Sequence, residues 1–140
     1  GMPVKRRCYD KNLDWVFDGV EEEVLGDFGF SGGGAAGFEL DRIDSKLGGD
    51  QEITILAQSY DLQDNFMLVP EEQLTHLTNV SGEPEINVKR ADMVYFQIPE
   101  GGCVFSVGSI TFCGSLPHNQ FINNISRILE NVVKKFCSIN

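Results

Sequence analysis

The sequence has no long hydrophobic run, because no apolar stretch approaches the roughly 18 residues that a membrane-spanning helix requires. It also opens without the charged, apolar and small-residue order of a secretory signal. These two absences predict a cytoplasmic protein with no membrane contact. Gly1 ahead of Met2 is expected to be an addition to the natural chain, so the predicted fold begins at Met2.

Basic and metal-ligating residues are scarce. The chain has 11 Lys and Arg against 21 Asp and Glu, a net charge of -10. A field of this sign repels a phosphate backbone, so no nucleic-acid partner is expected. The four cysteines form no C-x-x-C pair and no Cys/His ligand spacing, so reduced structural thiols are expected rather than a zinc site; they are Cys8, Cys103, Cys113 and Cys137.

The clearest predicted element is a helix over residues 121–136. Its apolar residues recur at helical spacing and form one wide stripe: Phe121, Ile122, Ile125, Ile128, Leu129, Val132, Val133 and Phe136. Asn119 is the predicted N-cap, and Lys134 and Lys135 suit the negative end of the helix dipole. A stripe this wide needs a large apolar surface to cover it, and a sheet is the expected one.

Strand patterns precede this helix. Residues 92–99 and 103–110 are rich in β-branched and aromatic residues around a short Gly-containing loop, which predicts an antiparallel hairpin. Residues 52–59 and 65–69 are further strand candidates with a turn at 61–64, residues 70–77 predict one helical turn, and residues 81–85 predict a loop. The first fifty residues show no sustained period. The expected fold is one α+β domain over 2–140, with mixed α/β layers, in which the C-terminal amphipathic helix packs on an antiparallel sheet.

Residues 32–37, Gly-Gly-Gly-Ala-Ala-Gly, match the G-x-G-x-x-G pattern of dinucleotide-binding loops. That fingerprint needs a strand before it and a full helix after it, and neither flank qualifies. A nucleotide-binding module is therefore the most remote of three functional hypotheses. The favoured interpretation is conformational: the glycines permit positive φ and close backbone approach, and residues 35–37 allow a short helix to pack tightly against a neighbour.

Three acids follow the glycines. Glu39, Asp41 and Asp44 lie close enough in sequence to bind a hard cation, but no Asp-x-Asp-x-Asp-Gly loop organises them. On a helix, Glu39 and Arg42 are i, i+3 neighbours. We therefore favour an ion pair between them over a carboxylate site.

Several serines lie near a histidine in the region before the last helix, a pattern that suggests a hydrolase. There is no G-x-S-x-G elbow around Ser109, and a Ser–His pair needs spatial proximity and an orienting acid. Ser109 and His118 are therefore expected to hydrogen-bond backbone groups of a connecting loop. His76, the other histidine, lies in a predicted surface turn with no such neighbour.

The chain resembles a known family in four stretches: WVFDGV at 15–20, GDFGFSGGGAAGFELDRID at 26–44, MVYFQIPEGGCVFSVGSITFCGSL at 93–116 and NNISRILENVVKKF at 123–136. Together they resemble the C-terminal portion of the large (β) subunit of N,N-dimethylformamidase-like proteins. The resemblance runs from about Asp14 to Phe136. It implies a fold similar to the end of a class I glutamine-amidotransferase-like domain.

The resemblance also implies a chemistry for the full-length family. Its members hydrolyse a small amide, converting dimethylformamide to formate and dimethylamine, at a mononuclear iron held by tyrosine and carboxylate side chains. Those ligands lie upstream of the portion matched here, and Tyr9, Tyr60 and Tyr95 do not align with them. No catalytic residue, metal site or cofactor is therefore expected in this chain.

Two further hypotheses remain open. In the first, the chain is a structural or accessory C-terminal domain of a small-amide hydrolase and is non-catalytic by itself. It then self-associates or binds a partner polypeptide that carries the upstream catalytic portion. In the second, it is an active small-amide hydrolase whose site is rebuilt from some of five candidates: Glu39, Asp41, Tyr95, Ser109 and His118.

Overall fold

A five-stranded antiparallel sheet forms the centre of the computed structural model, with strand order β2-β1-β3-β4-β5. The structure describes residues 1–44, 46, 52–60, 62, 66–75 and 79–138. Its strands are β1 (Val4–Arg6), β2 (Val24–Leu25), β3 (Thr54–Ser59), β4 (Asp92–Gln97) and β5 (Cys103–Ser106). Its helices are η1 (Lys11–Phe17), η2 (Pro70–Glu72), α1 (Glu85–Val88), α2 (Thr111–Ser115), η3 (His118–Phe121) and α3 (Asn124–Cys137).

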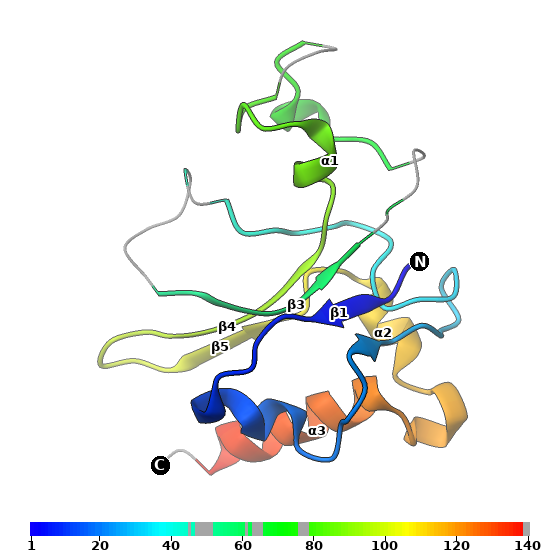
Figure 1. Ribbon diagram of the computed structural model, residues 1–140, viewed down its shortest axis with the longest axis vertical. Helices are drawn as coiled ribbons and strands as arrows, with labels where there is room; N and C mark the ends of the chain where they lie inside the picture. Colours follow the sequence, from blue (N-terminus) through cyan, green and yellow to red (C-terminus); the bar gives the residue numbers. More distant parts are fainter. Residues whose placement is uncertain (45, 47–51, 61, 63–65, 76–78, 139–140) are drawn as a thin grey trace.

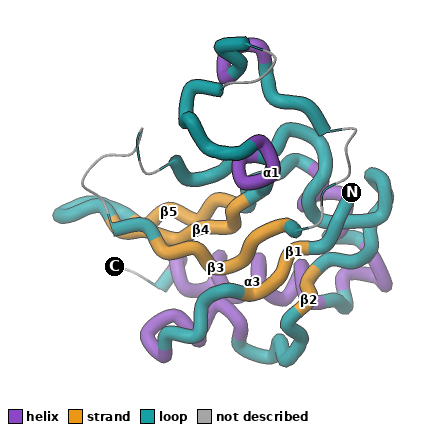
Figure 2. Tube along the Cα trace, turned by 45° about the horizontal axis from the view of Figure 1, so that its top comes forward, coloured by secondary structure: helices purple, strands orange, loops and turns teal. Residues whose placement is uncertain are grey.

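The sheet separates two unlike layers. Figure 1 shows η1 and α3 side by side below the sheet, where they contact each other. Figure 2 shows α1 and its loops on the other side of the sheet. The core lies between the sheet and α3, where Leu25, Leu56, Met93, Ile125 and Ile128 are fully buried. The α+β class and the packing of the C-terminal helix on an antiparallel sheet are confirmed.

The predicted hairpin is confirmed as β4 and β5. Val94 pairs with Ser106 and Gln97 with Cys103, and the loop closes through a hydrogen bond from the Ile98 N–H to the Gly102 carbonyl at 2.9 Å. The strand predicted at 52–59 is also confirmed, as β3, which pairs with β4. In β3 and β4 the local run of β-branched and aromatic residues agrees with a largely buried position in the sheet, whereas β5 at the edge is only partly buried.

The strands β1 and β2 were not predicted. β1 has the sequence Val-Lys-Arg, which carries no strand pattern, yet it lies between β2 and β3 with Val4 buried. η1 covers part of the same irregular N-terminal region, and its Val16 and Phe17 enter the core against α3. Long-range packing, rather than local periodicity, therefore orders the first 25 residues.

The C-terminal helix begins later than its pattern predicts. Its N-cap is Asn123, whose side chain accepts a hydrogen bond from the Ser126 N–H at 2.8 Å, and not Asn119. Asn119 has a φ of +49° and Gln120 one of +56°, so η3 turns the chain away before α3 starts. Of the predicted apolar stripe, Ile125, Ile128 and Val132 are buried, Leu129 and Phe136 pack against the core, and Phe121, Ile122 and Val133 are exposed.

Three other predictions differ from the structure. Residues 66–69 form no strand, and residues 35–44 form no helix. The helical turn predicted at 70–77 is shorter, since η2 ends at Glu72. The loop predicted at 81–85 gives way to α1 at its last residue. Asp61 and Asp64 of the predicted turn, Asn65 of the predicted strand, and His76 lie outside the described residues.

Candidate functional site

The glycine-rich segment 32–37 holds the chain close to its own N-terminal strand. Gly32 and Gly33 have φ angles of +76° and +81°, which favour glycine. A Cβ on Gly34 would lie 2.6 Å from the backbone nitrogen of Met2. That proximity allows Met2 and Ala36 to exchange two backbone hydrogen bonds, at 2.6 and 2.9 Å. The conformational interpretation of these glycines is confirmed, although no helix follows them among residues 35–44.

Ser109 is a buried structural hydroxyl. Its Oγ accepts a hydrogen bond from the Gly37 N–H at 3.0 Å and donates one to the Phe38 carbonyl at 2.8 Å. A third contact joins this Oγ to the Thr111 hydroxyl at 3.1 Å. The prediction that Ser109 satisfies backbone groups is confirmed. A hydroxyl whose proton and lone pairs are used in this way is poorly prepared to act as a nucleophile.

His118 lies apart from these contacts. Its ring stacks on Phe28, with 4.2 Å between the ring centroids and 15° between the planes. The Asn123 side-chain amide donates to the His118 carbonyl at 2.7 Å, so this residue is held by the cap of α3. The structure therefore does not bring Ser109 and His118 together as a nucleophile and its base.

The three acids after the glycines also separate. Glu39 and Asp41 are exposed, whereas Asp44 is largely buried and pairs with Arg42 at 3.4 Å. Arg42 makes a shorter ion pair with Glu72, at 2.7 Å, so the predicted Glu39–Arg42 pair is wrong. Because residues 35–44 are not helical, the i, i+3 spacing brings no two of these side chains together. Among the described residues, no cluster of three or more His, Cys, Asp or Glu side chains is arranged to hold a metal ion.

Tyr95 is the remaining sequence candidate, and it lies on β4 against the ring of Trp15. Its hydroxyl lies 3.2 Å from the Cys103 Sγ and accepts a hydrogen bond from the Gln97 amide at 3.1 Å. Burial raises the pKa of the Tyr95 hydroxyl, and the hydrogen bond with Cys103 raises it further. This part of the hairpin borders an open cavity of about 1200 Å³.

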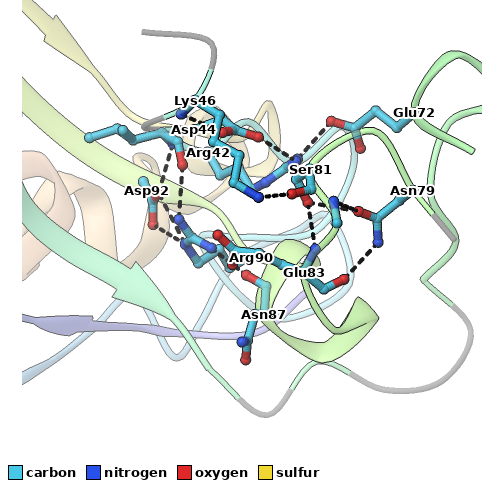
Figure 3. A network of polar contacts seen from close by, with 12 residues as sticks. Arg42, Asp44, Lys46, Glu72, Asn79, Ser81, Glu83, Asn87, Arg90 and Asp92 are labelled. Atoms are coloured by element: carbon cyan, nitrogen blue, oxygen red, sulfur yellow. Dashed lines mark hydrogen bonds and ion pairs between the residues drawn. The ribbon is translucent and has the colours of Figure 1, made fainter.

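A polar network that sequence reasoning missed surrounds Asp92 at the start of β4 (Figure 3). Both carboxylate oxygens of Asp92 accept from the Arg90 Nε–H, at 3.0 and 3.1 Å. The Ile43 N–H donates to the same carboxylate at 2.8 Å, and the Gln58 amide donates to it at 2.9 Å. Every polar atom of this buried carboxylate group is thus satisfied, which marks it as a structural junction.

The network extends to the loops above the sheet. The Lys46 ammonium group donates a hydrogen bond to the Ser81 carbonyl. The Ser81 hydroxyl donates one to the Asn79 side-chain oxygen at 2.7 Å. The Asn79 amide in turn donates to the Glu83 carbonyl at 2.9 Å. These contacts join segments that are far apart in sequence, as Figure 3 shows. The sequence signal for this network was Asp92 itself, a charged residue at the first position of the otherwise largely apolar strand β4.

Two adjoining cavities lie along residues 37–42, and we call them together the Phe38 groove. Their volumes are about 480 and 550 Å³, and Gly37, Glu39, Phe66 and Met67 line both. The first cavity also borders Met2, and the second extends along residues 40–42. The groove places two of the sequence candidates, Glu39 and Asp41, beside exposed apolar side chains. The other polar side chains that line it are Ser31 and Thr111 in the first cavity and Arg42, Glu72 and Lys89 in the second.

Among the described residues, no helix combines the length and the apolar content needed to cross a bilayer. The longest, α3, is 14 residues and carries both charged and polar side chains.

Comparison with known proteins relates this arrangement to a family. Residues 1–125 match the family model described as N,N-dimethylformamidase beta subunit-like, C-terminal. The N,N-dimethylformamidase beta subunits of Paracoccus aminophilus and of an Alcaligenes species are 38% and 36% identical to the chain over 128 residues. Each alignment covers 91% of this chain and 17% of the relative, so the chain spans about a sixth of the length of these curated relatives. The chain belongs to the N,N-dimethylformamidase beta subunit-like C-terminal family.

Proposed function

We propose that the chain acts as the non-catalytic C-terminal accessory domain of an amide hydrolase of the N,N-dimethylformamidase type. The observation that carries this proposal is the state of Ser109, whose hydroxyl is engaged with the Gly37 and Phe38 backbone. His118 stacks on Phe28, and Glu39 and Asp41 lie apart from both. The residue types for hydrolysis are present, but Ser109 and His118 contact other parts of the fold and the two carboxylates are exposed.

The extent of the family match supports the same proposal. The chain corresponds to 17% of the length of its relatives, which leaves most of those subunits to supply the reaction centre. We also propose that the iron ligands implied by the family resemblance lie upstream of this portion. We therefore propose that the substrate is a small amide such as dimethylformamide, and that it is bound and hydrolysed outside this domain.

We further propose that residues 2–140 form a single domain, related to the closing part of a glutamine-amidotransferase-like fold. A hairpin, β4 and β5, followed by the amphipathic helix α3 is the feature that supports this relationship. The sheet within the chain is antiparallel throughout. A parallel portion of such a fold would therefore lie in the upstream part of the longer subunits.

A chimeric enzyme tests the accessory role. The C-terminal portion of the P. aminophilus beta subunit is replaced by this chain, and dimethylformamide hydrolysis is measured as formate release. We expect the chimera to be active and the isolated chain to release no formate. A second chimera with His118→Ala should retain the activity, because this side chain takes no part in the reaction. Formate release by the isolated chain, and its loss in this variant, would show instead that the chain holds a rebuilt active site.

A further inference from the structure

Several apolar side chains that line the Phe38 groove are exposed to solvent. Met67 is 85% exposed and Phe38 is 67% exposed, and they border the same cavity. Val69, which lines the second cavity, is 54% exposed. Single exposed apolar residues are ordinary on protein surfaces, but several around a concave channel are typical of a binding surface.

The pairing of Met2 indicates what reaches this groove. Met2 and Ala36 form an antiparallel bridge, and the Cβ position of Gly37 lies 3.1 Å from the Gly1 Cα. In an antiparallel pair the two chains run in opposite directions. Gly1 and Met2 line the first cavity together with Gly37 and Phe38, so residues ahead of Met2 in a longer chain would begin at this cavity.

The relatives possess such residues. They are much longer than the matched portion, and the family model that matches residues 1–125 describes a C-terminal region. In a relative, the part of the chain that precedes the matched portion therefore connects directly to the position that corresponds to Met2. The exposed groove begins at that point.

The charges of the groove specify the chemistry of its occupant. Glu39 and Asp41 are exposed along it. Arg42 is already paired with both Glu72 and Asp44, and Lys89 is the other basic side chain that lines the second cavity. The groove therefore presents apolar side chains with two carboxylates, which suits an extended segment that alternates apolar residues with a Lys or Arg.

We propose that the Phe38 groove is the docking site for the extended segment that precedes this domain in the longer beta subunits. The segment enters the groove from the side of Met2 and covers Phe38 and Met67. This inference rests on the proposed accessory function, because it identifies the surface through which the domain contacts the upstream portion.

An extended protein tests the proposal with the full chain. On the order of ten residues, enough to run past 37–42 at the rise of a β-strand, are taken from the P. aminophilus subunit immediately before its matched portion. They replace Gly1 ahead of Met2. The reference protein carries the same residues in scrambled order, and thermal unfolding is followed in both. We expect the native order to raise Tm by about 5 °C over the scrambled order and to slow amide hydrogen exchange at Phe38 and Leu40.

Two variants locate the effect, and both replace exposed side chains, so neither removes a buried contact. Met67→Glu should abolish most of the Tm difference between native and scrambled extensions. Ile122→Glu is the matched control: Ile122 is 74% exposed, does not line the groove, and should leave the difference intact. Equal Tm for native and scrambled extensions, or a full difference retained in Met67→Glu, would overturn the docking site.

This result and the chimera test can fail separately. A Tm gain together with an inactive chimera would retain the docking site and reject the accessory role. An active chimera without a Tm gain would retain the accessory role and reject the docking site.

Discussion

Arg90 and Asp92 form an ion pair at the start of β4, with the Arg90 Nε within 3.1 Å of both carboxylate oxygens of a side chain that is 1% exposed. The Arg90 Nη2–H also donates to the Ile43 carbonyl at 2.9 Å, while the Ile43 N–H donates to Asp92. The pair thus connects the central sheet to the segment after the glycines. Residues 39–44 and the Phe38 groove beside them depend on this junction for their position.

Replacing Asp92 with Ala should destabilise the protein by about 3 kcal/mol, because it leaves the Arg90 guanidinium and two N–H donors without their acceptor. Urea unfolding measures the loss. The control is Asp14→Asn: Asp14 pairs with Arg6 at 3.3 Å but is 57% exposed, and a solvent-exposed pair contributes little. Equal midpoints for the two variants would contradict a structural role for the Asp92 junction.

Replacing Gly34 with Ala should cost about 1–3 kcal/mol, because the added Cβ would overlap the Met2 backbone at 2.6 Å and separate the Met2–Ala36 bridge. Gly102→Ala is the matched control, since a Cβ there meets nothing within 4 Å. Its Tm should stay the same or rise slightly. If Gly34→Ala is as stable as Gly102→Ala, the close approach of residues 34 and 2 is wrong.

Replacing Asn123 with Ala should cost about 1–2 kcal/mol, because the cap on the Ser126 N–H is lost. The same change also removes the donor to the Leu116 carbonyl. Asn119→Gly should cost less, since glycine adopts the positive φ of Asn119 at lower cost, which offsets the loss of the exposed hydrogen bond from the Asn119 amide to the Ile122 carbonyl. Thermal unfolding of the two variants distinguishes the caps. A larger loss for Asn119→Gly would restore Asn119 as the start of the helix.

The free energy of unfolding should decrease at alkaline pH because the hydroxyl of Tyr95 is buried. An unfolded tyrosine ionises at a pKa of about 10, whereas burial raises the pKa of Tyr95 in the folded protein. The folded state therefore holds its proton after the unfolded state has released it, and stability falls as the pH rises above about 10. Below that pH both states are protonated and this residue adds no pH dependence.

The check is the pH dependence of the urea midpoint in the wild type, Tyr95→Phe and Tyr9→Phe. Tyr95→Phe should decline less steeply above pH of about 10 than the wild type, because the ionising hydroxyl is gone. Tyr9 is 59% exposed, so Tyr9→Phe is the control for removing a tyrosine hydroxyl from the surface. Parallel curves for all three proteins would show that Tyr95 is not buried against Cys103.

Local sequence patterns were sufficient where neighbouring residues decide the structure. The hairpin of β4 and β5 was predictable because two β-rich runs are joined by a loop with glycines, and β3 because its run is equally rich. The helix α3 was predictable because its apolar residues share one face. Its start was not, because the three consecutive positive φ angles at 119–121 and the Asn123 cap depend on contacts with the preceding loop.

Other elements depend on partners far along the chain. Residues 66–69 have the composition of a strand but do not pair with one. The polar β1, in contrast, pairs with two strands, β2 and β3. The expected Glu39–Arg42 pair required a helix that does not form, and Arg42 reaches Glu72 across 30 residues instead. Composition indicates which secondary structure a segment can adopt, and contacts with distant segments decide whether it adopts that structure.

The sequence by itself determined the α+β class, the acidic surface, the family and the structural role of Ser109. Only the tertiary structure decided the Asp92 junction and the Phe38 groove, which join segments around residues 2, 38, 67 and 92. The physical reason is the range of the interactions. Propensity and periodicity act between residues a few positions apart, whereas a buried carboxylate or a groove exists only after distant segments have packed and excluded water.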